Sequence, residues 1–249
     1  MTNDELIVKS SIQLFIADKE YPKPQGFGSG CILIYEGQKY LISVSHVTDH
    51  GLTTFLETNQ PPIDNTTPLK PVGGLIYYNL LNLKSNITAF ELEKELENGG
   101  QRLDITFAKV EEPLDLLQPE LNIDNLKITA GKKVFIDATR IVKPNKNERY
   151  GFYGKVRPEY IGYYLKTTPT LKNNLTYTST VGNFHIFVSD KIILDKEDYE
   201  GCSGAPILDN QGNLVALACK IRVNSKLIYG FSIQECVKLL KITIDTKQI

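Results

Sequence analysis

EGCSGAPIL, residues 200–208, places Ser203 between two glycines, immediately before an apolar run that begins at Pro206. Gly201 allows backbone conformations that other residues avoid, so its amide and that of Ser203 can point at one spot. Two converging N–H donors stabilise the negative oxygen of a tetrahedral intermediate. The stretch therefore predicts a nucleophilic serine with a backbone oxyanion hole; the plainer interpretation is a glycine-rich turn with an incidental serine.

A histidine in the first half of the chain is the candidate base. His46 follows an apolar run, residues 40–45 (YLISVS), and precedes a polar turn. The end of a strand holds an imidazole rigidly while one ring nitrogen stays open to take a proton. His50 lies four residues on, the spacing of a zinc pair on a helix, but no Cys or carboxylate cluster completes such a site. We expect no metal and no cofactor, and a purely structural role for His46 is the alternative.

Asp104 is the candidate orienting acid. It begins an apolar run, residues 103–110 (LDITFAKV). Strands are poor in Asp, and the burial of a lone carboxylate is costly. A buried imidazole partner removes that objection, because the acid fixes the histidine tautomer and stabilises the imidazolium. An exposed Asp at a strand edge is the alternative, and Asp49 is the reserve acid.

Chain order tests two other nucleophile geometries. The α/β-hydrolase elbow needs a glycine two residues after the serine, where this chain has Ala205, and a histidine after the serine, where this chain has none. A subtilisin-like order could use Asp137 and His185, but it requires a parallel α/β sheet. The recurrent short apolar runs favour an all-β chain instead.

These β-branched or apolar runs are separated by turn residues along the whole chain. They lie at residues 6–16, 31–35, 39–45, 103–110, 133–137, 184–188, 191–194, 206–209 and 213–221. Helices are expected at 89–97 and after the capping pattern Ser232-x-x-Glu235 near the C-terminus. Residues 139–178 are interpreted as a join between two halves with loops attached.

The composition limits the cellular location and the classes of binding partner that we expect. The 249 residues include 28 basic and 29 acidic side chains, so we expect neither nucleic acid nor an anionic membrane as a partner. No apolar run is long enough for a spanning helix. The N-terminus lacks a secretory signal pattern, which favours a cytoplasmic protein. The four cysteines show no paired spacing and agree with a reduced setting.

The chain resembles the trypsin- and chymotrypsin-like serine peptidases, especially the bacterial stand-alone forms. GCSGAP at 201–206 matches the Gly-x-Ser-Gly-Gly-Pro turn of that family at five of six positions, and the order His46, Asp104, Ser203 is the family's own. Further similar segments are the glycine-rich opening at 26–34, SVSHV at 43–47, LDITF at 103–107, the strand at 212–216 and the approach to a last helix at 229–233.

The resemblance implies a fold and a domain division. The expected fold is two six-stranded antiparallel Greek-key β-barrels with a short C-terminal helix. Residues 1–120 would form the barrel that carries His46 and Asp104, and residues 121–249 would form the barrel that carries Ser203. The cleft between the barrels would hold a single catalytic unit.

The resemblance also implies the chemistry. The expected function is that of a serine endopeptidase with narrow specificity for a protein or peptide. Ser203 would attack, His46 would shuttle the proton, Asp104 would orient His46, and the amides of Gly201 and Ser203 would bind the oxyanion. Two alternatives stay open: a β-barrel binding module that keeps the fold without turnover, and an esterase on the same scaffold.

Departures from the family bear on regulation. Cys202 stands where secreted members have the Asp that pairs with a new N-terminal amine, so activation of that kind is not expected. No cysteine flanks His46, so the secreted members' disulfide beside the histidine is absent. The segment 50–100 is longer than in compact members and is expected to cover or gate the cleft. Because unchecked proteolysis in the cytoplasm would be harmful, we expect narrow specificity or an activating partner.

Specificity rests on residues next to the serine. In this family the residues just before the serine form part of the primary pocket wall. Glu197 or Asp198 would then select a basic side chain, and Lys220 on the neighbouring strand would neutralise or invert that preference. The alternative interpretation of the acidic residues is a solvated loop.

Overall fold

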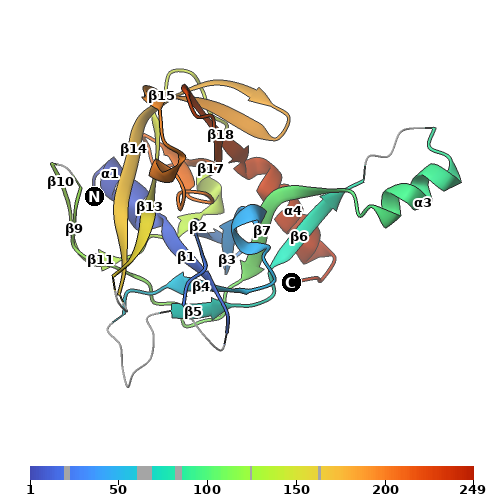
Figure 1. The fold of residues 1–249 in the computed structure, drawn as a ribbon, viewed down its shortest axis with the longest axis horizontal. Coiled ribbons are helices and arrows are strands. Elements are labelled where there is room, and N and C mark those ends of the chain that lie inside the picture. Colours follow the sequence, from blue (N-terminus) through green and yellow to red (C-terminus); the bar gives the residue numbers. More distant parts are fainter. Residues whose placement is uncertain (20–22, 61–68, 82–85, 124, 162–163) are drawn as a thin grey trace.

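A computed structural model describes the chain except for residues 20–22, 61–68, 82–85, 124 and 162–163 (Figure 1). It is mostly β, with a C-terminal helix, as predicted. In chain order the elements are α1 (Asn3–Ser10), β1 (Ile12–Ala17), β2 (Gly26–Tyr35), β3 (Gln38–Ser43), α2 (Ser45–Thr48), β4 (Thr53–Glu57), β5 (Leu69–Val72), β6 (Ile76–Leu80), α3 (Ala89–Glu97), β7 (Gln101–Lys109), β8 (Leu117–Gln118), β9 (Leu121–Ile123), β10 (Leu126–Ile128), β11 (Gly131–Lys132), β12 (Ile136–Asp137), the 3₁₀ turn η1 (Ala138–Arg140), β13 (Tyr150–Ile161), β14 (Tyr164–Val181), β15 (Phe184–Ile193), the 3₁₀ turn η2 (Lys196–Asp198), β16 (Pro206–Asp209), β17 (Leu214–Ile221), β18 (Ser225–Ser232) and α4 (Ile233–Asp245).

The second half of the chain forms a closed barrel. Its strands follow the order β13-β14-β15-β18-β17-β16, and β13 pairs with β16 to complete the circle. The long strands β13 and β14 occupy most of residues 139–178, so the interpretation of that stretch as loops was wrong. Tyr, Thr and Val recur along these strands and suit a half-buried pleated surface. Lys and Asn fall mainly on exposed positions, which is why the composition suggested loops.

The first half forms an eight-stranded sheet. Its order is β5-β4-β1-β2-β3-β7-β6, with β12 pairing in parallel with β2. The described residues thus give one closed six-stranded barrel and one larger sheet, where two six-stranded barrels were predicted. One of the strands beyond six comes from the linking segment, because Ile136 and Asp137 of β12 pair with Leu33 and Ile34 of β2, past the part of β2 that pairs with β1. The proposed division at residues 120 and 121 stays a prediction.

The terminal helices join the two halves. The prediction of a strand over residues 6–16 was wrong for its first part, because Thr2 and Glu5 form a capping box that starts α1. Ile7 of α1 is buried against the closed barrel, where a Cβ atom on Gly151 would lie 2.8 Å from it. The expected C-terminal helix is present as α4, although Ser232 makes no side-chain cap.

The segment 50–100 adds strands to the eight-stranded sheet and then extends away from it. It contributes β4, β5 and β6, and α3 follows at the predicted residues 89–97. None of the residues of α3 is buried, and Figure 1 shows α3 on an arm that extends away from the two halves. The helix therefore lies apart from the region between the halves, which the longer segment was expected to cover. No helix among the described residues has both the length and the apolar character needed to cross a membrane.

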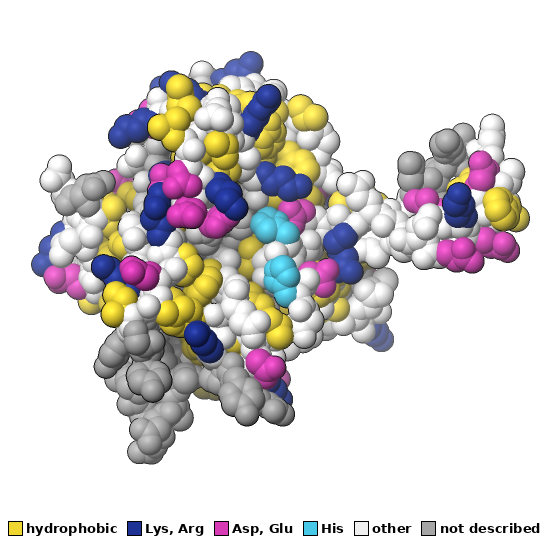
Figure 2. Space-filling model, viewed as in Figure 1, with side chains coloured by type: hydrophobic (Ala, Val, Ile, Leu, Met, Phe, Trp, Pro, Cys, Tyr) yellow, Lys and Arg dark blue, Asp and Glu magenta, His cyan; other side chains and the backbone are white. Residues whose placement is uncertain are grey.

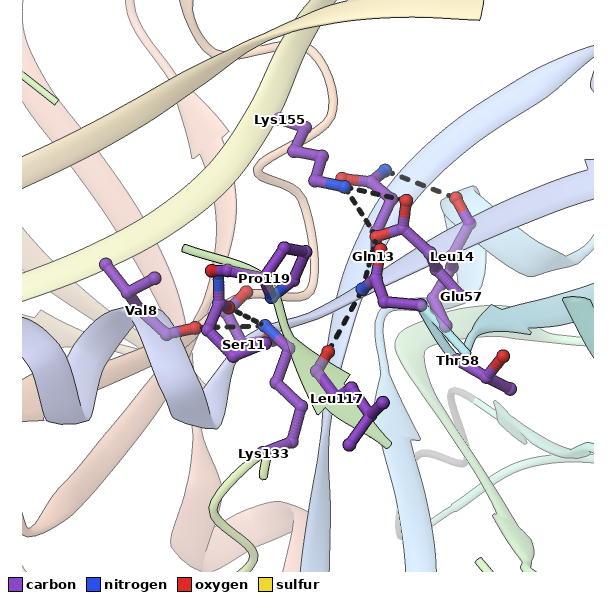
Figure 3. A network of polar contacts seen from close by, with 12 residues as sticks. Val8, Ser11, Gln13, Leu14, Glu57, Thr58, Leu117, Pro119, Lys133 and Lys155 are labelled. Carbon is purple, nitrogen blue, oxygen red and sulfur yellow. Dashed lines mark hydrogen bonds and ion pairs between the residues drawn. The ribbon is translucent and has the colours of Figure 1, made fainter. Parts of the chain in front are cut away.

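Polar contacts connect the two halves directly (Figure 3). Lys155 of β13 pairs with both carboxylate oxygens of Glu57, the last residue of β4. Ser11, next to β1, donates its hydroxyl to the carbonyl of Tyr153 at 2.7 Å. Both contacts meet β13, so the first strand of the closed barrel is held in place by the first half.

Lys133 lies in the same network and is enclosed by acceptors. Its ammonium donates to the carbonyls of Val8 and Ser11, at 3.2 and 2.6 Å, and to Gln118 Oε1 at 2.7 Å. Burial lowers the pKa of Lys133 from 10.5 to about 7. The unfolded chain therefore holds this proton up to a higher pH than the folded protein does, so the folded state gains stability as pH rises from about 7 to 10.5.

Lys133→Met is expected to lower the free energy of unfolding by about 2–4 kcal/mol, because three buried acceptors lose their donor. The difference between wild type and variant should grow as pH rises from 7 to 10, since only the wild type releases this proton. Urea unfolding at several pH values measures both effects. Lys132→Met, at an exposed neighbouring position, is the matched control. A stability difference that shrinks with rising pH would contradict this assignment.

Candidate active site

His46 and Asp104 are brought together by the register of two strands. β3 pairs antiparallel with β7, so that Ser43, the last residue of β3, lies opposite Thr106. His46 follows Ser43 by three residues and Asp104 precedes Thr106 by two, so both lie at the same end of this strand pair. His46 sits in the single turn of α2, where its Nδ1 lies 2.8 and 2.9 Å from the two carboxylate oxygens of Asp104. The backbone N–H of His46 donates to the same carboxylate at 3.1 Å. The side chain of His46 is 42% exposed and that of Asp104 14% exposed, so the ring stands between the acid and solvent.

The carboxylate of Asp104 is held in its charged form. Burial alone would raise its pKa, but the hydrogen bonds and the charge of His46, together with the hydrogen bond from Cys219, hold the pKa well below its ordinary value. Ser45 adds a further donor, with its hydroxyl 3.2 Å from Oδ1. Asp104 is therefore ionised at neutral pH and fixes the orientation of the imidazole.

Cys219 is a member of this group that the sequence reasoning missed. It lies on β17 of the closed barrel, and its thiol donates to Asp104 Oδ2 at 2.9 Å. Burial and the negative charge of Asp104 raise the pKa of this thiol, which keeps it protonated as a donor. The sequence offers no local signal for it, because the contact depends on how the two halves pack.

The turn that carries Ser203 depends on its two glycines. Gly201 and Gly204 have φ values of 105° and 87°, which favour glycine. A Cβ atom on Gly201 would lie 2.1 Å from the carbonyl oxygen of Lys155, so no side chain fits there. The carbonyl of Gly201 accepts from the hydroxyl of Ser29 at 2.6 Å, and that of Ser203 from the Ser29 amide at 2.7 Å. Among the described residues, the Gly201 and Ser203 amides make no hydrogen bond, so both remain available as donors.

Ser203 lies in a pocket next to the His46–Asp104 pair. Within the described part of the chain, its hydroxyl makes no hydrogen bond to His46; such bonds are often long without substrate. Ser203 and Cys219 line the same cavity, and Cys219 contacts Asp104. In Figure 2, histidine side chains lie at the surface near a group of acidic and basic side chains in the middle of the body.

The pocket beside Ser203 has a volume of about 180 Å³. Its wall is mainly apolar, with charged side chains at Lys196, Glu200 and Lys220. The lining residues are Phe152, Lys196, Tyr199, Glu200, Cys202, Ser203, Ala218, Cys219, Lys220, Ile221 and Ile228.

The three residues predicted to set specificity do not lie together. Glu197 and Asp198 form ion pairs with Arg157 and are not among the lining residues. Lys220 does line the pocket, and its ammonium also lies 5.5 Å from the ring centre of Phe184. The acidic side chains are thus engaged outside the cavity.

The alternative residues considered from sequence lie elsewhere or have other partners. Asp49 pairs with Arg102 at 2.7 Å. Asp137 caps η1 through the amide of Thr139, and His185 bonds Thr180 in the closed barrel. These contacts leave Asp104 as the acid that holds His46.

Three side chains at the site offer atoms of metal-ligand type. Nitrogen, oxygen and sulfur atoms of His46, Asp104 and Cys219 lie within 4.8 Å of one another. The carboxylate is already bonded to both other groups, and the raised pKa of the thiol disfavours the thiolate that a metal requires. We therefore interpret the cluster as a hydrogen-bonded unit.

Comparison with solved structures identifies the fold. The serine endoprotease from Yersinia pestis superposes with a TM-score of 0.52 and 12% identity, over 98% of this chain and 67% of that one. The MamO protease domain from Magnetospirillum magneticum, in its apo form, has a TM-score of 0.49 and 12% sequence identity. The match covers 94% of this chain and 96% of that domain. No protein-family model matches the sequence, and no curated protein matches it significantly. The chain has the fold of the trypsin- and chymotrypsin-like serine peptidases.

Proposed function

We propose that the protein is a serine endopeptidase that hydrolyses peptide bonds through an acyl-enzyme on Ser203. The observation that carries the proposal is the His46–Asp104 pair, joined at 2.8 Å beside the pocket that contains Ser203. With Nδ1 bonded to the carboxylate, the neutral ring presents its other nitrogen, Nε2, as a proton acceptor. A general base of this kind is what a serine nucleophile requires.

The reaction follows from these groups. The Ser203 hydroxyl attacks the scissile carbonyl carbon as its proton passes to His46 Nε2. The amides of Gly201 and Ser203 stabilise the resulting oxyanion, a contribution on the order of 3–4 kcal/mol for a single donor. His46 then gives the proton to the leaving amine, and water, activated by the same imidazole, hydrolyses the acyl-enzyme.

The proposed cleft lies where the two halves meet. His46 and Asp104 belong to the half assigned to residues 1–120, and Ser203 belongs to the half assigned to residues 121–249. The amide of Ser29 in β2 supports this placement, because it bonds the carbonyl of Ser203 from the opposite half. A protein or peptide substrate would cross this junction.

Reaction with a fluorophosphonate probe tests the proposal. The purified wild-type protein is expected to be labelled at Ser203, as located by mass spectrometry, because the probe needs an activated serine. Peptide and ester substrates should then be compared, since turnover of peptides identifies a peptidase, whereas turnover of esters alone identifies an esterase. A folded wild-type protein that shows neither labelling nor turnover would instead support the inactive β-barrel binding module.

We expect the enzyme to prefer an uncharged, apolar side chain next to the scissile bond. Phe152, Ala218 and Ile228 line the pocket, whereas Glu197 and Asp198 pair with Arg157. Glu200, the acid in the wall, is already paired with Lys196 at 3.0 Å, and Lys220 adds a second cation, so a buried basic side chain would carry a desolvation penalty. A peptide-library profile measures the preference, and Ala218→Val should shift it toward smaller side chains. A dominant preference for Lys or Arg would contradict this expectation.

A further inference from the structure

Carboxylates of the loop that precedes Ser203 converge on one guanidinium. Arg157 Nε donates to Asp198 Oδ1 at 2.9 Å, and Nη2 donates to Asp195 Oδ2 at 2.6 Å. Nη1 lies 3.5 Å from Glu197 Oε2. Asp195 also accepts the amide of Glu197 at 3.0 Å and so caps η2. The arginine therefore binds both ends of this short turn.

The backbone of β13 directs Arg157 toward the loop. Val156 pairs with Thr168 and Glu159 pairs with Lys166, so residues 157–158 oppose a single residue of β14. Such a bulge re-aims a side chain away from the regular ladder. Arg157 has a φ of 52°, in the left-handed region that non-glycine residues rarely adopt. This local conformation serves the contact with η2 and not the pairing of the strands.

The same stretch of β13 also contacts the nucleophile turn itself. A Cβ atom on Gly154 would lie 2.7 Å from Cys202 Sγ, and one on Gly201 would lie 2.1 Å from the carbonyl oxygen of Lys155. Residues 154–157 therefore support the loop at two places: the backbone supports its end at Ser203, and the Arg157 side chain supports its beginning at η2.

The residue before the serine carries no charge that could hold the loop. Cys202 is buried, and burial raises the pKa of its thiol to about 12, so it is neutral. The ion pairs of Arg157 with Asp195, Glu197 and Asp198 thus hold the beginning of this loop against β13. The paired side chains are about half exposed, so we expect the strength of these pairs to fall with rising salt.

We propose that Arg157 is a positioning residue that holds residues 195–203 in the conformation in which the Gly201 and Ser203 amides bind the oxyanion. The proposal rests on the serine-peptidase function proposed above. A misplacement on the order of 1 Å at a reacting centre costs roughly 10²-fold in rate. Arg157→Ala is therefore expected to lower kcat by about 10- to 100-fold, with a smaller change in KM.

Hydrogen exchange and kinetics of matched variants test the proposal. In Arg157→Ala, amides of residues 195–203 should exchange faster while the strands keep their protection. Arg157→Lys keeps the charge but loses the bidentate fork, so it should restore part of kcat. Arg149→Ala, at an exposed arginine just before β13, is the control and should resemble the wild type. High salt should bring the wild type toward Arg157→Ala and leave that variant unchanged.

The outcomes separate this proposal from the function on which it rests. Unchanged exchange and unchanged kcat in Arg157→Ala would overturn the positioning role while the peptidase function stands. A wild-type protein that does not react with the fluorophosphonate would overturn the peptidase function, and the exchange data would still decide whether Arg157 holds the loop. If Arg157→Ala loses protection throughout, Asp198→Asn, which weakens one contact and keeps the arginine, replaces it.

Discussion

Ser203→Ala is expected to lower peptide hydrolysis by on the order of 10⁶-fold, leaving only the small residual rate that substrate binding and the oxyanion donors supply. The variant removes the only atom that forms the acyl bond, so neither His46 nor the oxyanion donors can compensate. Initial rates on a peptide that the wild type cleaves, measured at high enzyme concentration, cover this range. Labelling by a fluorophosphonate should disappear at the same time.

The loss should affect the chemistry alone, because the Ser203 hydroxyl makes no hydrogen bond to any of the residues that the structure describes. The carbonyl of Ser203, and not its hydroxyl, is what Ser29 holds at 2.7 Å, so the turn should keep its shape. Thermal unfolding and near-UV circular dichroism should therefore match the wild type. Ser179→Ala, at an exposed position on β14, is the control and should keep full activity. Residual hydrolysis above about 1% of wild type would contradict the role of Ser203.

The sequence was sufficient to predict those features that depend on a short local pattern of residues. Apolar runs predicted eight of the eighteen strands found among the described residues, mainly those that are buried along most of their length, because such a run is a local feature of the sequence. Asp104 was identified because an acid at the head of an apolar strand needs a partner, and the structure supplies His46 at 2.8 Å. The glycines around Ser203 were identified because only glycine tolerates the conformations found there.

The sequence was not sufficient where contacts depend on long-range packing. Cys219 and Arg157 meet the site only after the closed barrel sets the register of β17 and β13. Glu197 and Asp198 were assigned to the pocket from their position before the serine, but Arg157 draws both toward β13. A composition rich in Lys and Asn concealed two long strands, since the second half of β13 and many positions of β14 are exposed. The capping box of Thr2 and Glu5 was a local signal for α1 that went unused.

Asp104→Asn is expected to lower kcat by roughly 10⁴-fold, with KM changed far less. Asp104 receives hydrogen bonds from the amide and ring of His46, from Ser45 and from Cys219, so a carboxylate, which only accepts, suits every contact. An Asn side chain must turn its NH₂ group toward some of these donors. If the NH₂ group meets His46 Nδ1, the ring is forced to carry its proton on Nε2, and it cannot then accept the proton of Ser203.

The variant also separates the orienting role of Asp104 from a structural one. The ionised carboxylate stabilises the folded state above its unfolded pKa of 3.8, and this contribution is lost as pH falls through the lower folded value. Asp104→Asn should therefore be less acid-sensitive than the wild type in unfolding experiments, although it is far less active at neutral pH. Cys219→Ala is the matched comparison, because it removes one neutral donor and leaves the tautomer intact, so its kcat should fall by no more than about tenfold. Equal losses in the two variants would show that Asp104 acts through packing, whereas a loss confined to Asp104→Asn identifies the tautomer of His46 as the quantity that Asp104 controls.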